Sequence, residues 1–180
     1  MSSRAETLLM QGHQARRERR MDDAKRIFAE AVDAARLSKD RPWLARAYTE
    51  LGRVERDLGE IDAAKRHYED AAAVYRRLDE PLRLAHTVRH VGDILREDGK
   101  LEPAGPCYRE ALEIYRAHPE TPPLDLANAI RGYALLQEEI GETTEALALW
   151  REARELYAAV NVQAGVDEGD RRIERLSRVA

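Results

Sequence analysis

Small and aromatic residues recur along this chain at one long period. Gly12, Gly52 and Gly92 lie 40 residues apart, and Ala134 follows 42 residues later. A fixed period of roughly 20 to 50 residues is the signature of a repeat architecture. We therefore expect four copies of one structural unit. Three further columns keep the same steps: Ala24, Ala64, Ala104 and Ala146; Phe28, Tyr68, Tyr108 and Trp150; Ala31, Ala71, Ala111 and Ala153.

The contents of each unit predict a pair of helices. In the second unit, apolar positions at three- and four-residue spacing run from Tyr48 to Leu58, where Gly59 follows, and resume from Ala64 to Tyr75. A tight turn between two helices favours a residue in the left-handed conformation, which glycine adopts without steric cost. Glycines at this position are expected to make the turns: Gly59, Gly99 and Gly141.

Two places depart from the pattern. The first unit has "RRERRMDD" where the turn glycine belongs, so its turn is expected to be irregular or longer. The third unit carries Pro103 and Pro106 at the start of its second helix. Proline is tolerated in a first helical turn, but Pro106 is near the limit of that tolerance. This helix is expected to start late or to be distorted.

The repeated segments resemble the tetratricopeptide repeat, whose helical hairpin carries W-x2-L-G-x2-Y followed by A-x3-F. The best copies are "YTELGRVERDLGEIDAAKRHYEDA", residues 48–71, and "VRHVGDILREDGKLEPAGPCYREA", residues 88–111. Their length resembles the family's long-helix branch, such as kinesin light chain. The resemblance implies an all-α fold, a right-handed α-solenoid of four helix-turn-helix repeats in a single domain, residues 1–180. The repeats are expected at residues 3–40, 41–80, 81–121 and 122–162.

After the last repeat, one apolar stripe runs through an otherwise charged segment and is formed by Val166, Ile173 and Leu176. Repeat arrays need a terminal element with a polar outer face to cover their last hydrophobic surface. We therefore expect a C-terminal capping helix over residues 164–178.

Composition and charge narrow the class of protein. The 180 residues include 36% charged residues and carry a formal charge of −4, which argues against a general nucleic-acid binder. Cys107 is the only cysteine, so a disulfide framework is excluded and a reducing compartment is favoured. No apolar run is long enough to span a membrane. We expect a cytoplasmic protein without a membrane partner.

The resemblance implies that the first helix of each hairpin lines a concave groove that binds a protein or peptide segment. Apolar parts of the partner are expected to pack against Leu9 and Leu135. Helical phase from the glycine column gives the candidate partner-binding residues: Arg16, Arg53, Arg56, His86, Arg89, His90, Arg96, Asn128 and Arg131.

A ladder of arginines stands out in this groove, because Arg16, Arg56 and Arg96 keep the 40-residue period and end at Glu138. Guanidinium groups at this spacing suit a partner with carboxylates or phosphates, hence an acidic segment. The alternative is a solvated face, in which i, i+4 pairs such as Arg53–Asp57 and Arg89–Asp93 neutralise each other.

Other functions have weaker support. No phosphate loop, nucleophile elbow or Cys/His constellation is present, so we expect no catalytic residues, no enzyme activity and no cofactor. Self-association as a homodimer, through an edge of the array or the C-terminal helix, is the main alternative. A small metal- or ligand-binding protein centred on His86 and His90 is weaker still: the i, i+4 spacing suits zinc, but Arg89 beside them disfavours a dication.

Overall fold

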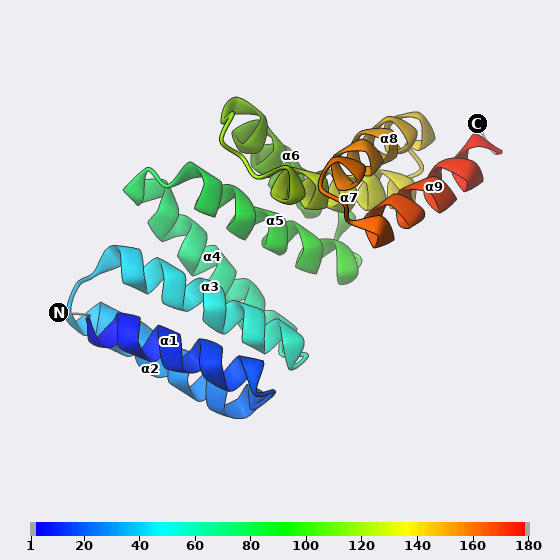
Figure 1. Ribbon diagram of the computed structural model, residues 1–180. Coiled ribbons are helices and arrows are strands. Elements are labelled where there is room, and N and C mark those ends of the chain that lie inside the picture. Colours follow the sequence, from blue (N-terminus) through cyan, green and yellow to red (C-terminus); the bar gives the residue numbers. More distant parts are fainter. Residues whose placement is uncertain (1–2, 179–180) are drawn as a thin grey trace. The chain divides into compact units, whose positions relative to one another are not determined.

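The computed structural model describes residues 3–178, and within that range the chain folds into nine α-helices without a β-strand (Figure 1). The prediction of an all-α chain of helical hairpins is therefore confirmed. The helices are α1 (Arg4–Arg17), α2 (Met21–Leu37), α3 (Arg41–Asp57), α4 (Ile61–Leu78), α5 (Pro81–Glu97), α6 (Leu101–Ala117), α7 (Pro123–Ile140), α8 (Thr143–Ala159) and α9 (Gln163–Ser177).

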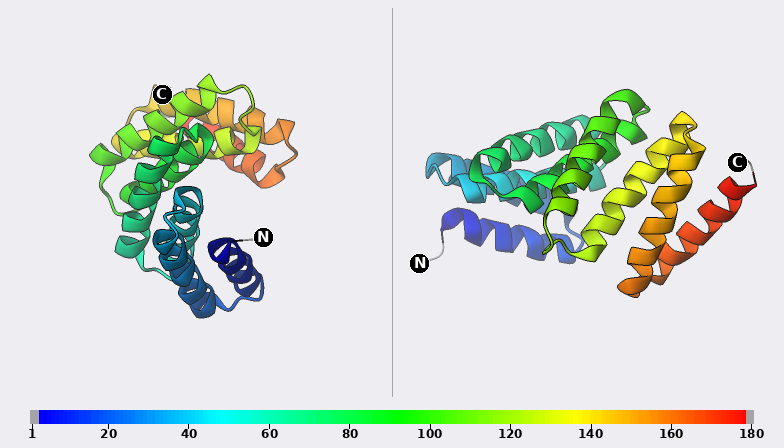
Figure 2. Two further views of the ribbon diagram at one scale, coloured as in Figure 1. Left: turned by 90° about the vertical axis from the view of Figure 1, so that its left-hand side faces the viewer. Right: turned by 90° about the horizontal axis from the view of Figure 1, so that it is seen from above.

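The helices gather into two compact units, and the division falls inside α5, between Thr87 and Val88. In the first unit α1 packs on α2, α2 on α3, and α3 on α4, and α1 also contacts α3. In the second unit α6 packs on α7, α7 on α8, and α8 on α9. Figures 1 and 2 show α8 and α9 side by side at the end of the chain.

The repeating columns form the core of each hairpin. The aromatic residues Phe28, Tyr68, Tyr108 and Trp150 are fully buried, as are the alanines of the neighbouring columns. The glycines of the first column oppose them, and a side chain there would be tight at Gly52 and Gly92 and would clash at Gly12. A Cβ atom added at Gly12 would lie 2.4 Å from Phe28 Cε1. The sequence period thus records where two helices approach closely.

The turns between paired helices confirm the glycine prediction, but they correct the prediction made for the first repeat. Gly59, Gly99 and Gly141 adopt φ values of 80°, 73° and 87°. In the first repeat, Arg19 takes the left-handed conformation in the turn between α1 and α2, with φ 59°. The amide of Arg20 donates to the carbonyl of Ala15, as the amide of Glu60 donates to that of Glu55. The first turn is therefore neither irregular nor longer, since a non-glycine residue tolerates this conformation at a modest steric cost.

Helix α6 also differs from its prediction. It begins at Leu101 and continues through Pro106 without starting late. The carbonyl that Pro106 leaves without its helical donor belongs to Glu102, an exposed residue of the first turn. Water can bond that carbonyl, so the proline costs less there than in a buried helix interior.

Helix α9 covers the last hairpin, as the apolar stripe predicted. Val166 and Leu176 are buried, and a Cβ at Gly165 would lie 2.4 Å from the ring of Tyr157. On the polar side of α9, Asp170 Oδ1 accepts a hydrogen bond of 2.8 Å from Arg154 Nε of α8. No helix within residues 3–178 has the length and apolar character needed to cross a membrane.

Candidate functional site

The first-helix surface of the first unit is built around one carboxylate. Glu50 of α3 lies where α1 and α3 meet, and its side chain is 15% exposed. Its Oε2 atom has three nitrogen neighbours: Arg16 Nη1 at 3.5 Å, Arg53 Nη1 at 3.6 Å and His13 Nδ1 at 3.8 Å. Within the described part of the chain, none of them forms a hydrogen bond with this oxygen. Two arginines and a histidine therefore surround one acceptor oxygen without bonding it.

Two predicted residues complete this surface. Arg53 Nη2 lies 3.3 Å from His86 Nε2, and Arg16 Nε lies 3.9 Å from Asp57. An arginine has only donors, so His86 is placed to accept from it as a neutral imidazole. Arg56 is partly buried one turn farther along α3. We define the α1–α3 surface by its two carboxylates and by the arginines and histidines beside them: Glu50, Asp57, Arg16, Arg53, Arg56, His13 and His86.

In the second unit, by contrast, the predicted residues engage acceptors of the chain itself. Arg89 Nη1 donates to Asp93 over 2.7 Å, and both side chains are 12% exposed. Asp93 also accepts from the Tyr108 hydroxyl at 2.8 Å and has His90 Nδ1 at 3.5 Å. His90 Nε2 lies 2.8 Å from Arg89 Nη2. The pair Arg89–His90 therefore serves to hold a buried carboxylate.

The electrostatics of this cluster follow from its burial. Burial alone would raise the pKa of Asp93, but the hydrogen bond from His90 and the charge of Arg89 outweigh it, so the pKa lies far below its usual range. Burial raises the pKa of Tyr108, and the adjacent Asp93 charge raises it further. Asp93 is thus an anion and Tyr108 a neutral donor at neutral pH.

The other predicted residues of the second unit are also paired. Arg96 Nη1 donates to Glu139 over 2.6 Å. Arg131 makes a two-pronged contact with Glu168 of α9, through Nε at 2.6 Å and Nη2 at 3.0 Å. Asn128 Oδ1 accepts from the Tyr157 hydroxyl at 2.8 Å. Bidentate, partly buried arginine pairs are among the stronger ionic contacts.

Glu138, the expected end of the arginine ladder, contacts the capping helix α9 and does not lie on an open surface. Glu138 is 8% exposed and accepts from the indole of Trp150, from Arg172 at 3.1 Å, and from Arg175. Leu9 and Leu135, expected to meet a partner, are 4% and 8% exposed. Both pack inside their own units, because the apolar stripe that sets helical phase also fills the core.

Sequence reasoning missed Glu50 and Glu168 as the acceptors of these arginines. Glu50 lies one helical turn from Arg53 on α3, whereas Glu168 lies on α9, 37 residues from Arg131. Within residues 3–178 no three His, Cys, Asp or Glu side chains are grouped as metal ligands. His86 and His90 each lie within hydrogen-bond distance of an arginine instead.

Comparison with known proteins adds two matches to family models. A model described as "Tetratricopeptide repeat" matches residues 3–77, and a second with that description matches residues 90–118, together more than half of the chain. No curated protein matches. The solved structure of BtubC (BKLC) from P. vanneervenii aligns with a TM-score of 0.71 and 17% identity, covering 93% of this chain and 77% of that one. At this identity the likeness establishes the fold alone.

Proposed function

The chain belongs to the tetratricopeptide repeat family, and we propose that it is a scaffold that binds an acidic segment of a partner protein on the α1–α3 surface. Repeats of this family generally mediate protein–protein interaction and typically serve as non-catalytic scaffolds. The choice of an acidic segment goes further and depends on the charges of this chain.

One observation carries the proposal: two arginines and a histidine lie 3.5 to 3.8 Å from Glu50 Oε2, and none of them forms a hydrogen bond with it. The side chains of Arg16 and Arg53 are 33% and 31% exposed, so a partner can reach them. A guanidinium gains most from a short, two-pronged contact with a carboxylate. An incoming Asp or Glu would supply that contact, which Glu50 does not.

The balance of charge on the α1–α3 surface favours an anion as well. Its three arginines, Arg16, Arg53 and Arg56, exceed its two carboxylates, Glu50 and Asp57. In the second unit Arg89, Arg96 and Arg131 each donate to an internal acid over 2.6 to 2.7 Å. An acidic partner would have to displace those bonds, so the first unit is the better site.

Selection from a random peptide library displayed on phage would test this function. Peptides retained by the wild-type chain are expected to be rich in Asp and Glu, and their affinity should fall with rising salt. The double variant Arg16→Glu/Arg53→Glu should bind them at least about tenfold more weakly, because two attractive charges become repulsive.

The matched control is Arg26→Glu/Arg36→Glu, which makes the same charge change on α2, where both side chains are at least 60% exposed. It should bind as wild type does. Selected peptides without acidic residues, or equal losses in both double variants, would refute the proposed site. Self-association stays a prediction, and light scattering of the wild-type chain checks it.

A further inference from the structure

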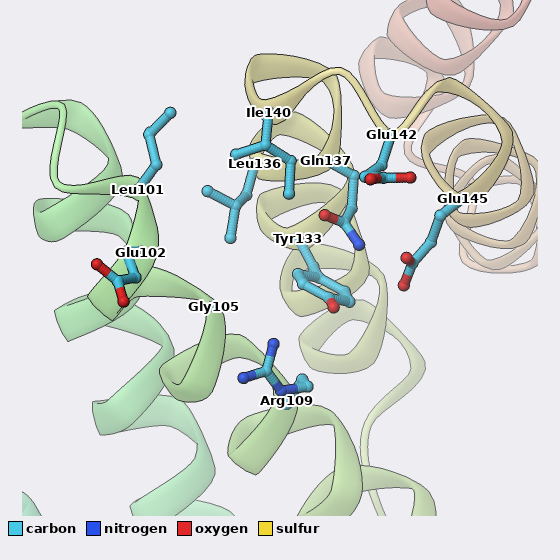
Figure 3. A pocket seen from close by; sticks show the side chains of 10 residues that line it. All are labelled: Leu101, Glu102, Gly105, Arg109, Tyr133, Leu136, Gln137, Ile140, Glu142 and Glu145. Atoms are coloured by element: carbon cyan, nitrogen blue, oxygen red, sulfur yellow. The ribbon is translucent and has the colours of Figure 1, made fainter.

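An open cleft of 590 Å³ lies in the second unit between α6, the end of α7 and the start of α8 (Figure 3). We call it the α6–α8 cleft. Gly105 of α6 forms its floor, and Leu136 supplies apolar surface. Its polar lining includes Glu102, Gln137, Glu142 and Glu145. None of these four residues belongs to the α1–α3 surface.

The internal repeat shows what the cleft lacks. Residues of α2 correspond to those of α6 at a step of 80, as Ala24 does to Ala104. Residues of α3 and α4 correspond to those of α7 and α8 at a step of 82, as Gly59 does to Gly141. By these steps Gly105 stands where the first hairpin has Lys25.

In the first unit, Lys25 reaches across from α2 and bonds Glu60 at the start of α4. The hydrogen bond to Glu60 raises the pKa of Lys25, and the charges of Glu55 and Asp22 act in the same direction. These three acids surround one ammonium group. Their counterparts around Gly105 are Glu142, Gln137 and Glu102, all of which line the cleft. The second unit therefore keeps most of a lysine's surroundings but has no lysine side chain there.

A buried amide independently points into the same space. Gln137 is 4% exposed, and within the described residues its side chain forms no hydrogen bond. Figure 3 shows this amide directed into the cleft, with Glu145 beside it. Because Gln137 makes no hydrogen bond to the described residues, its amide can bond a donor or acceptor that enters the cleft.

The cleft also carries uncompensated negative charge. Within residues 3–178, Glu102, Glu142 and Glu145 take part in no ion pair. Arg109 is the cation of the lining, and it too lacks an acidic partner within that range. Three carboxylates against one guanidinium favour a further cation, which the first unit supplies from its own Lys25.

We propose that the α6–α8 cleft receives one lysine side chain of a partner protein. Its aliphatic stem packs against Leu136, as the stem of a lysine packs on apolar surface elsewhere. Its ammonium reaches Glu142, the counterpart of Glu60, and donates to the amide oxygen of Gln137, while the charge of Glu102 acts at longer range. A compact ammonium with rotatable donors suits these acceptors better than a planar guanidinium does. This site goes beyond the acidic-partner function and does not depend on it.

Nuclear magnetic resonance titration of the full chain tests the site directly. The probe is Nα-acetyl-lysine N-methylamide, added to about 50 mM because a single side chain binds weakly. The side-chain amide of Gln137 and the backbone amide of Gly105 are expected to shift saturably. The norleucine analogue, which keeps the stem without the charge, should leave both unchanged. Equal shifts with norleucine would overturn the proposal.

The variant Gly105→Lys places the chain's own lysine in the cleft and should abolish these shifts. A Cβ at Gly105 fits, since its nearest neighbour is Arg109 Nη1 at 3.1 Å, the end of a flexible side chain. Shifts that persist in a folded Gly105→Lys protein would refute the site. Glu142→Gln, an exposed substitution that leaves the fold unchanged, should weaken binding by about two- to fivefold. Unaltered affinity in that variant would also count against the proposal.

A matched variant in the first unit tests the correspondence itself. Lys25→Ala should open the equivalent space beside Glu60, so the probe should then shift the amides of Glu60 as well. Absence of that second site would contradict the inference from the repeat. Spermidine separates a protein lysine from a free polyamine: binding at least about tenfold tighter than the lysine probe would replace the proposed partner. Weaker or equal binding supports a protein lysine.

Discussion

The buried carboxylate of Asp93 offers the sharpest test of how the second unit is held together. Asp93 is 8% exposed and the ring of Tyr108, which donates to it over 2.8 Å, is fully buried. We consider Asp93→Asn, Tyr108→Phe and the double variant. Both substitutions nearly preserve shape, so a cavity contributes little and the change in stability measures the polar contacts.

The magnitudes follow from the geometry. Asp93→Asn removes the charge that Arg89 meets at 2.7 Å with both side chains 12% exposed. This pair lies between an exposed ion pair, which contributes about 1 kcal/mol or less, and a fully buried one, whose disruption costs about 3–5 kcal/mol. We expect a loss of about 2–3 kcal/mol. Tyr108→Phe removes one hydrogen bond to a charged group, a loss of about 1.5–3 kcal/mol.

The two losses should not add, because both substitutions remove the same hydrogen bond. A coupling energy of about 1–2 kcal/mol is expected, since contacting residues in one network usually couple at this level. Urea unfolding in a Trp43→Phe background is the assay. The remaining tryptophan, Trp150, is fully buried in α8 and reports on the second unit alone. Coupling below about 0.3 kcal/mol would refute the account of Asp93 as the centre of the cluster.

The stability difference between wild type and Asp93→Asn should depend on pH, with a sign that follows from the pKa of Asp93. The pKa of Asp93 is depressed in the folded state, where hydrogen bonding from His90 and the charge of Arg89 outweigh burial. Its contribution is therefore fully present above the unfolded pKa of about 3.9 and is lost as the pH falls through the folded value. The stability difference between wild type and Asp93→Asn should stay constant from neutral pH to about pH 5 and shrink below about pH 4. A difference that grows on acidification would show that the sign is wrong.

Further substitutions test the packing, the first turn and the capping helix α9. Gly132→Ala should lower the stability of the protein by about 1–3 kcal/mol in thermal unfolding, because the new Cβ would lie 2.6 Å from Tyr108 Cε1. Gly105→Ala has room for its Cβ and should raise the stability by up to about 1 kcal/mol. Arg19→Gly should raise the melting temperature through a gain of roughly 0.5 kcal/mol, because residue 19 has φ 59°; a lower melting temperature would contradict the turn geometry. Glu138→Gln should loosen α9, which Arg172 and Arg175 join to this carboxylate, and trypsin should then cleave α9 several-fold faster than in the control Glu174→Gln, as mass spectrometry would show.

The fold was open to prediction because its cause is local and repeated. Each small residue at a fixed step marks a close approach between helices, so the spacing of Gly12, Gly52 and Gly92 gave the hairpins before any contact was known. The regular turn in the first repeat was not predicted, because a glycine is favoured but not required at a left-handed position. The start of α6 was missed because the cost of a proline depends on whether water reaches the carbonyl it leaves unpaired.

The candidate sites depended on contacts that no period encodes. Helical phase placed Arg131 correctly on a first helix, but its acceptor, Glu168, comes from a helix outside the repeats. Long charged side chains pair with whatever acceptor the neighbouring helix presents, and the register between helices sets that choice. The cleft at Gly105 likewise required three helix segments to be brought together. The sequence by itself therefore determined which helices form and pair, because backbone packing repeats. Only the tertiary structure decided which arginines donate to an acid of the chain at short range and which do not, because those contacts cross between helices and differ at each crossing.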